Sequence, residues 1–288
     1  MTPILLPITK IQTENSQVKT FFFDYPLQAK PGQFVMLWIP GVDQKPFSVG
    51  YQNDNTFGLT VFKRGPLTEK LFTMKVGERV GITGPFGTAF TTSSDLHYIM
   101  VAGGYGAAPL GFLAESLPCH LKQSEGSTID FLIGARNKNL LLFKERLLKI
   151  PNLKLHIATD DGSYGYKGYV TDMLLGILKH LPCPCLPTGS GRQGVQDDNN
   201  NSKTLVVTCG PELMEKKVLD MCNEKNIDCE ISIERYMKCG FGVCGQCVVD
   251  GPGICMCQQG PVVKRELANQ ITEFGKYHRD KTGAIVNL

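Results

Sequence analysis

The 288-residue sequence has little net charge, a formal +3 from 30 basic and 27 acidic side chains. Proteins that follow a phosphate backbone need a strongly basic surface, so nucleic-acid binding is disfavoured. Histidine is scarce as well, and the five histidines are dispersed without the spacing of metal ligands. We therefore assign no histidine to metal binding or to acid–base catalysis.

Long apolar runs are also missing. The first residues, MTPILLPITKIQTENSQ, have neither the basic start nor the continuous apolar segment of a secretory signal peptide, which predicts a cytoplasmic protein. The longest uncharged stretch, Tyr98–Ala114, contains four glycines and a proline and is short for a membrane helix. We expect no membrane span and interpret this stretch as a buried strand, a glycine turn and the start of a helix.

The length and the 42% of hydrophobic residues fit a globular protein of two domains. Over residues 1–95, short β-branched and aromatic runs alternate with turn-forming Pro, Gly, Asn and Asp, which predicts an antiparallel β-barrel. Over 96–235, strands alternate with helices, one of them expected at Leu140–Leu148, and this pattern predicts an open, mostly parallel α/β sheet. The polar segment 181–203 inside it is predicted to be a mobile loop.

Cysteine is abundant, and it is concentrated. Five of the eleven cysteines lie between Cys239 and Cys257. The spacing Cys239-x4-Cys244-x2-Cys247, followed by Cys255 or Cys257, is typical of the ligands of a plant-type [2Fe–2S] cluster. Zinc is the alternative. Zinc sites, however, favour two short Cys-x2–4-Cys pairs separated by a longer span, whereas here one Cys-x2-Cys pair is preceded by a cysteine at x4 spacing. We predict an iron–sulfur module over 236–265, followed by a polar tail over 266–288.

Two glycine-rich turns indicate a nucleotide site. Val101–Pro109 follows a predicted strand and opens a helix, where backbone N–H groups can hold a phosphate. A tight strand-to-helix turn without a ligand would have the same residues, so this signal alone is weak. Thr208–Met214 again ends a strand and begins a helix. Because ligands of open α/β sheets gather at the carboxyl ends of the strands, we expect the two turns to line one crevice.

The order of the motifs resembles that of a known family. The motifs are found at Lys45–Ser48, Gly65–Thr68, Gly84–Gly87, Val101–Leu110, Thr159–Asp172, Cys209–Met214 and Glu234–Cys247. In this order the chain is similar, along nearly its whole length, to the electron transfer subunits of NAD-dependent dihydroorotate dehydrogenases of the B type, within the ferredoxin-NADP reductase superfamily. The last two motifs in combination are the most specific.

The resemblance implies three cofactors: FAD, NAD and a [2Fe–2S] cluster. It implies that FAD is lined by Lys45, Pro46, Phe47, Ser48, Val61, Phe62, Lys63, Gly65, Leu67 and Thr68. It implies that NAD is held by Gly103, Gly104, Gly106, Cys209, Gly210, Pro211 and Glu212. The implied cluster ligands are Cys239, Cys244, Cys247 and Cys257, because the family's fourth ligand precedes a Gly-Pro-Val segment. Lys45 departs from the family's arginine, and it keeps the charge but loses the bidentate fork.

The resemblance also implies a function. A separate FMN-containing catalytic subunit, in a heterotetramer with this chain, would oxidise dihydroorotate in pyrimidine (UMP) biosynthesis. Electrons would pass through the cluster and FAD to NAD⁺, without a catalytic acid, base or nucleophile in this chain. One alternative is a diaphorase-type subunit of a hydrogenase or sulfur reductase, or a ferredoxin-NAD(P) reductase. Another is a non-catalytic zinc-binding interaction protein on a degenerate flavoprotein fold.

Overall fold

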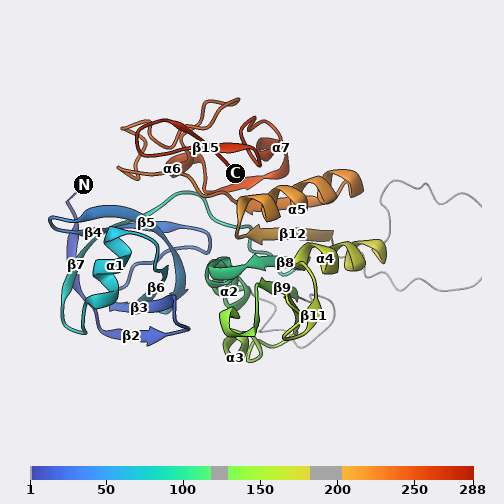
Figure 1. The fold of residues 1–288 in the computed structure, drawn as a ribbon, viewed down its shortest axis with the longest axis horizontal. Helices are drawn as coiled ribbons and strands as arrows, with labels where there is room; N and C mark the ends of the chain where they lie inside the picture. The colour runs from blue at the N-terminus through green and yellow to red at the C-terminus, as the bar shows by residue number, and fades with distance from the viewer. Residues whose placement is uncertain (1, 118–128, 182–202) are drawn as a thin grey trace, which may run out of the picture.

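The computed structural model describes residues 2–117, 129–181 and 203–288. In these residues two seven-stranded sheets stand side by side, and the C-terminal segment lies across the boundary between them (Figure 1). The loop expected at 181–203 falls almost wholly outside the described residues. No helix in the described ranges is long and apolar enough to cross a membrane.

The first sheet is antiparallel, in the order β1-β7-β4-β5-β6-β3-β2. Its strands are β1 (Ile4–Pro7), β2 (Lys10–Thr13), β3 (Val18–Asp24), β4 (Phe34–Ile39), β5 (Asp43–Gln52), β6 (Thr56–Phe62) and β7 (Arg79–Phe86). Between β1 and β2 the backbone changes partner: the N–H of Ile8 donates to the carbonyl of Glu78, and that of Thr9 to Phe22, both at 2.9 Å. The N-terminal segment thereby joins the two edges of the sheet. The predicted antiparallel barrel is confirmed.

The inside of the barrel is filled by large apolar side chains. Phe21, Phe23 and Phe57 are fully buried, and the rings of Phe23 and Phe57 stack with centroids 5.1 Å apart. Helix α1 (Pro66–Thr73) follows β6 and adds Leu67 and Leu71 to this core. Burial of these rings and aliphatic chains stabilises the barrel independently of any ligand.

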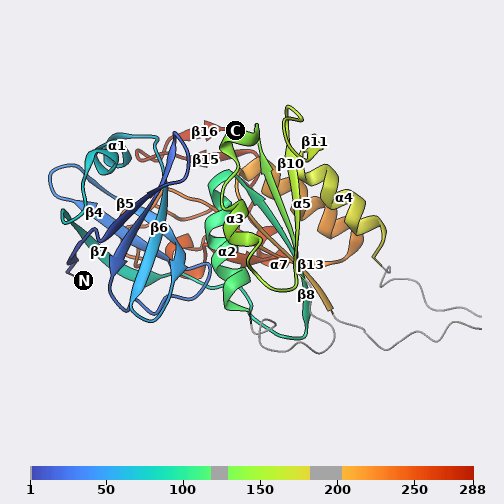
Figure 2. The same ribbon diagram turned by 90° about the horizontal axis from the view of Figure 1, so that it is seen from below.

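The second sheet has the order β11-β10-β9-β8-β12-β13-β14, and all of its pairs are parallel except β13 with β14. Its strands are β8 (Leu96–Gly103), β9 (Ile129–Ala135), β10 (Leu153–Thr159), β11 (Tyr166–Lys167), β12 (Lys203–Cys209), β13 (Asp228–Ser232) and β14 (Val262–Lys264). Helices α4 (Val170–Lys179) and α5 (Glu212–Lys225) cover one face, and α2 (Ala107–Ser116) packs on the other (Figure 2). The predicted α/β sheet is confirmed, and β14 extends it with residues from the cysteine-rich segment, residues 236–265.

The remaining short elements lie around Phe143 and near the C-terminus. The helix expected at Leu140–Leu148 is broken into a 3-10 turn at Lys138–Leu140 and α3 (Lys144–Leu147), with Phe143 between them in the left-handed region at φ 60°. After β13 come α6 (Met256–Gln259), α7 (Arg265–Ala268) and the hairpin of β15 (Tyr277–Arg279) and β16 (Ile285–Asn287).

Candidate cofactor sites

The segment Lys45–Ser48 forms an open edge of the barrel. It lies in β5 opposite β4, where Lys45 pairs with Leu37 and Phe47 with Val35. The other neighbour, β6, pairs with β5 only from Val49 onward. Proline is tolerated in a sheet at such an edge, which accounts for Pro46. One side of this backbone is therefore available to a bound molecule.

Lys45 connects this edge to the segment before the cysteines. Its Nζ donates to the hydroxyl of Tyr236 at 3.0 Å, lies 3.1 Å from a carboxylate oxygen of Asp43, and lies 4.2 Å from the centroid of the Tyr236 ring. Partial burial opposes the charge, but the hydrogen bonds to Tyr236 and Asp43 outweigh it and raise the pKa of Lys45. Lys45 therefore stays charged at neutral pH at the place where the barrel meets the cysteine-rich segment.

The end of β6 meets the first glycine turn. Val61 points into the barrel core, but the ring of Phe62 stacks on Tyr105 with centroids 5.9 Å apart. The hydroxyl of Tyr105 donates to Glu234 at 3.2 Å. Desolvation by the surrounding protein raises the pKa of Tyr105 and of Glu234, although water still reaches the Glu234 side chain. Three chain segments that are distant in sequence thus converge here.

Gly65, Leu67 and Thr68 form the start of α1. The Thr68 hydroxyl accepts from the N–H groups of Arg64 and Gly65, at 2.9 and 3.0 Å, and donates to the Gly65 carbonyl. Leu67 is buried in the barrel core. Both side chains are occupied in capping and packing the helix, so any contact of this segment with FAD has to come from its backbone.

The two glycine turns pack directly on each other. A Cβ at Gly106 would lie 2.1 Å from the carbonyl oxygen of Cys209, and one at Gly103 would lie 2.5 Å from the Pro211 ring. A Cβ at Gly210 would lie 2.9 Å from the nitrogen of Gly103. The structure therefore brings the two turns together, as expected. Gly106 and Gly210 are required by contact between backbones, and Gly103 by contact with the Pro211 ring.

Gly104 differs from the glycines beside it. Its φ is +54°, and a Cβ there would have no heavy atom within 4 Å. Only its backbone conformation requires glycine. Gly104 therefore exposes the peptide groups of the turn to open space, which is the condition for a phosphate or ribose to approach them.

The four proposed cluster ligands are arranged as two pairs. Cys239 and Cys244 are accessible to solvent and lie next to each other, whereas Cys247 and Cys257 are buried. The N–H of Cys257 donates to the sulfur of Cys247 at 3.4 Å, and that of Gly242 to the sulfur of Cys257 at 3.1 Å. A [2Fe–2S] cluster takes two thiolates on each iron, so the donor set fits such a cluster.

Backbone N–H groups favour a thiolate at Cys239, the first of the proposed cluster ligands. Partial burial opposes ionisation of Cys239, but the N–H groups of Cys244, Phe241 and Val243 donate to its sulfur and lower its pKa to about 6. Within the described ranges no three His, Cys, Asp or Glu side chains are grouped as a single metal ion requires. Because the two irons divide four thiolates into pairs, this arrangement fits a two-iron cluster better than zinc.

The cysteine-rich segment lies against the barrel. A Cβ at Gly240 would lie 2.7 Å from the Met36 side chain, and the ring of Phe241 is 6.5 Å from that of Phe86. Thr88 donates its N–H to Gly260 at 2.7 Å and its hydroxyl to Val262 at 2.6 Å. The cysteines, the open edge of β5 and the glycine turns therefore belong to one connected region of the molecule.

A buried arginine joins the parts of this region. Arg235 donates from Nη1 and Nη2 to Glu212, at 2.8 and 3.2 Å, and from Nε to Glu273 at 2.5 Å. Glu212 also accepts from the N–H of Gly275 at 2.9 Å, and Glu273 from that of Asp250 at 3.2 Å. Both carboxylate oxygens of Glu212 are thus engaged within the protein, so its predicted contact with NAD has to come from its backbone.

Glu215 is a second buried ionisable residue near the glycine turns that the sequence motifs did not indicate. It is 1% exposed and accepts from the N–H of Gly210 at 2.9 Å. Burial raises its pKa well above the usual range, and burial together with Glu215 and Glu234 raises that of Cys209. A signal was present: Glu215 stands three, four and seven residues before Val218, Leu219 and Cys222 on the apolar face of α5.

The comparisons with known proteins agree with this geometry. A family model described as the iron–sulfur cluster binding domain of dihydroorotate dehydrogenase B matches residues 234–267. A probable dihydroorotate dehydrogenase B (NAD(+)), electron transfer subunit, of Methanocaldococcus jannaschii is 42% identical over 281 residues, which cover 98% of this chain and 97% of the relative. The chain belongs to this family of electron transfer subunits.

Two further matches extend the comparison. The similarly named Methanocella arvoryzae subunit is 38% identical over 288 residues and covers 98% of both chains. The solved structure of an NADH-dependent reduced ferredoxin-NADP oxidoreductase has a TM-score of 0.73 and 25% identity, covering 94% of both chains. The barrel followed by the α/β sheet is therefore the fold of ferredoxin reductase-like flavoenzymes.

Replacing Gly106 with alanine tests the close packing of the two turns in this subunit. Because the Cβ would overlap the Cys209 carbonyl, we expect a loss of about 3 kcal/mol of stability, the upper end for overpacking. Weaker NADH binding should accompany it. Thermal unfolding and NADH titration measure both. The control is Gly176→Ala in α4, where a Cβ meets nothing within 4 Å and stability should rise by about 0.5–1 kcal/mol. Equal stability of the two variants would contradict the packing.

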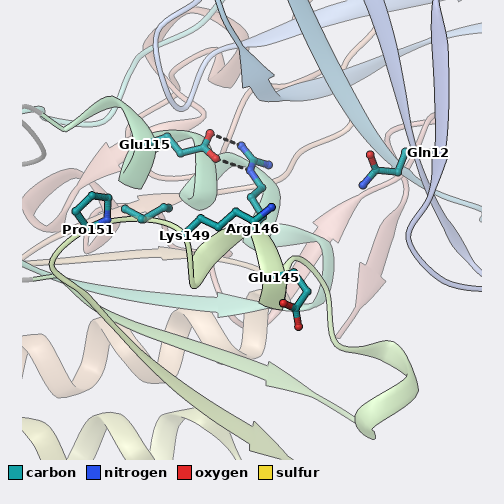
Figure 3. Close-up of a pocket in the computed structure, with 7 residues that line it drawn as sticks. Gln12, Glu115, Glu145, Arg146, Lys149 and Pro151 are labelled. Carbon is teal, nitrogen blue, oxygen red and sulfur yellow. Dashed lines mark hydrogen bonds and ion pairs between the residues drawn. The ribbon is translucent and has the colours of Figure 1, made fainter.

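The cavity in Figure 3 lies outside these sites. It has a volume of about 430 Å³, and it is lined by Gln12 of the barrel and by Glu115, Glu145, Arg146 and Lys149 of the α/β part. Arg146 donates to both oxygens of Glu115, at 2.8 and 2.7 Å, and to the carbonyl of Gly50 at 2.8 Å. The Arg146 side chain therefore holds the α/β part against β5, the strand that also contains Lys45–Ser48.

Proposed function

We propose that this chain carries electrons from a dihydroorotate-oxidising, FMN-containing catalytic subunit to NAD⁺, through a [2Fe–2S] cluster and FAD, in pyrimidine (UMP) biosynthesis. The observation that carries the proposal is the convergence of the open β5 edge, the paired glycine turns and the paired cysteines, connected by the contact of Lys45 with Tyr236. The names of the relatives support a partner subunit and NAD.

The arrangement meets the chemical need of the reaction. FAD accepts single electrons from an iron–sulfur cluster and gives a hydride to NAD⁺, so it belongs between the two. Lys45, Pro46, Phe47 and Ser48 would hold FAD along the open edge, next to Tyr236. Gly103–Gly106 and Cys209–Glu212 would hold NAD through their peptide groups. Cys239 and Cys244 would bind the accessible iron, and Cys247 and Cys257 the buried one.

The proposal extends to the assembly. Two copies of this chain and two catalytic subunits would form a cytoplasmic heterotetramer. Within the chain, residues 1–95 would bind FAD, 96–235 NAD and 236–265 the cluster, with 266–288 as the C-terminal tail. The connection of Glu212 to Glu273 through Arg235 would hold the NAD part against the last two segments.

The test is coupled turnover with the FMN-containing catalytic subunit. Mixed with that subunit, dihydroorotate and NAD⁺, the chain should form NADH, measured at 340 nm, in step with orotate. Neither subunit alone should do so. NADH formation with reduced ferredoxin but not with dihydroorotate would contradict the proposal. It would favour a ferredoxin-NAD(P) reductase, the activity class of the solved ferredoxin-NADP oxidoreductase structure that this chain resembles.

Lys45 provides a narrower prediction about FAD. Lys45→Gln removes the charge at the open edge and should raise the dissociation constant of FAD about tenfold, the usual scale of one charge-assisted hydrogen bond. Lys45→Arg should hold FAD at least as tightly as lysine, because it adds the bidentate fork. Flavin fluorescence during dialysis measures both. Lys30→Gln, at an exposed position, is the control. An unchanged FAD affinity in Lys45→Gln would contradict this role.

A further inference from the structure

The segment Cys239–Cys257 contains five cysteines, one more than the proposed cluster needs. The fifth, Cys255, is partly buried, and its thiol lies next to that of Cys247. The backbone N–H of Cys257 donates to the sulfur of the same Cys247 at 3.4 Å. Two cysteines therefore share one partner, the buried Cys247, whereas Cys239 and Cys244 are paired with each other.

The backbone explains how both thiols reach the same place. Cys255 is the residue before α6 and Cys257 is the second residue of that helix. The N–H of Met256, between them, donates to the carbonyl of Cys247 at 3.1 Å, which holds the start of α6 against the Cys247 backbone. Cys257 is 1% exposed, so its sulfur faces the interior, and Cys255 lies on the side nearer the solvent.

The turn before Cys255 is packed at one end and open at the other. At Gly251 a Cβ would lie 2.1 Å from the carbonyl of Gln270, so this end of the turn is tightly packed. At Gly253 nothing lies within 4 Å of a Cβ, and the φ of +67° is held by glycine alone. The residues that lead to Cys255 are therefore unobstructed at Gly253, and a shift of the Cys255 sulfur would have to overcome the hydrogen bond from the Val249 N–H to the Ile254 carbonyl at 3.1 Å.

We propose that Cys255 is an interchangeable fourth ligand of the cluster, able to replace Cys257 beside Cys247. In the exchange, a bond from iron to the Cys255 sulfur forms and the bond to Cys257 breaks. The proton of the Cys255 thiol passes to the leaving Cys257 thiolate, and no oxidation state changes. The inference rests on the proposed function, because it assumes that the chain binds a [2Fe–2S] cluster.

The test compares cluster content in alanine variants of the full chain, measured by iron analysis, visible absorbance and electron paramagnetic resonance of the reduced protein. Cys257→Ala should keep at least about half of the wild-type iron, with altered g values, because four thiolates remain available. The double variant Cys255→Ala, Cys257→Ala should keep less than about a tenth. Cys255→Ala should match the wild type. Cys244→Ala is the matched control, because no spare thiol shares its partner.

The outcomes separate the inference from the proposed function. Wild-type protein without iron overturns both. If the wild type holds a cluster but Cys257→Ala contains as little iron as the double variant, the exchange alone is overturned. If Cys257→Ala fails to retain FAD, it is misfolded. The test is then made with Cys257→Ser, because serine has nearly the same shape as cysteine. The g values of Cys257→Ser should change when Cys255→Ala is added, and identical g values would overturn the exchange.

Discussion

Replacing Cys244 with alanine is expected to remove the cluster and to disconnect the chain from its catalytic subunit. Cys244 is an accessible member of the Cys239–Cys244 pair, and without it one iron loses half of its protein ligands. Dihydroorotate-dependent NADH formation should fall more than about a hundredfold, beyond the usual cost of disturbing residues that support the ligands. Visible absorbance and coupled turnover measure the two effects.

The same variant should keep the reaction between NADH and FAD. The open β5 edge and the glycine turns are built from residues of the barrel and the α/β sheet, none of which is a cluster ligand. NADH-dependent reduction of a two-electron dye should therefore stay within about twofold of the wild type, since FAD alone supplies that chemistry. Full coupled turnover in a variant without cluster absorbance would contradict the assigned electron path.

Replacing Arg235 with methionine should have the largest effect on stability. Arg235 is 8% exposed, and its removal leaves the carboxylates of Glu212 and Glu273 without their cation. Breaking a buried ion pair in this way costs about 3–5 kcal/mol. Because these carboxylates also fix the backbone at Gly275 and Asp250, the C-terminal segments should loosen from the glycine turns. Thermal unfolding measures the loss.

The chain offers a matched control for this prediction. Arg279 binds Asp250 at 2.9 Å with both side chains about one-third exposed, so Arg279→Met should cost only about 0–1 kcal/mol. Both variants lose an arginine that pairs with an acid of the C-terminal part. If the melting temperatures of the two variants fall by the same amount, burial of the Arg235 network adds nothing to the stability of the protein. A fall confined to Arg235→Met would support it.

Local patterns predicted the large features of this molecule. The alternating runs of the first 95 residues predict the barrel, and the strand–helix alternation predicts the parallel sheet. The helix expected at Leu140–Leu148 is found only over Lys144–Leu147, because Phe143 adopts a left-handed conformation that breaks it. The run from Leu140 to Phe143 is continuously apolar, so it has no periodicity from which such a break could be read.

Long-range pairings set the limit of prediction for the sites. Arg235 and Glu273 are 38 residues apart and Lys45 and Tyr236 are 191 apart, so no local pattern relates them. Spacing alone left Cys255 and Cys257 as equal candidates for the fourth ligand. The N–H of Gly242, which donates to the Cys257 sulfur, favours Cys257. Leu67 and Thr68 remain predicted FAD contacts, although their side chains serve the barrel core and α1.

The central claim is that one chain joins a two-electron flavin to a one-electron cluster. An anaerobic dithionite titration of the purified protein, with FAD and iron quantified in the same sample, tests it most directly. The wild type should take up about three electrons per chain, two at FAD and one at the cluster, and Cys244→Ala about two. Uptake of two electrons by the wild type, or of none, would contradict the claim.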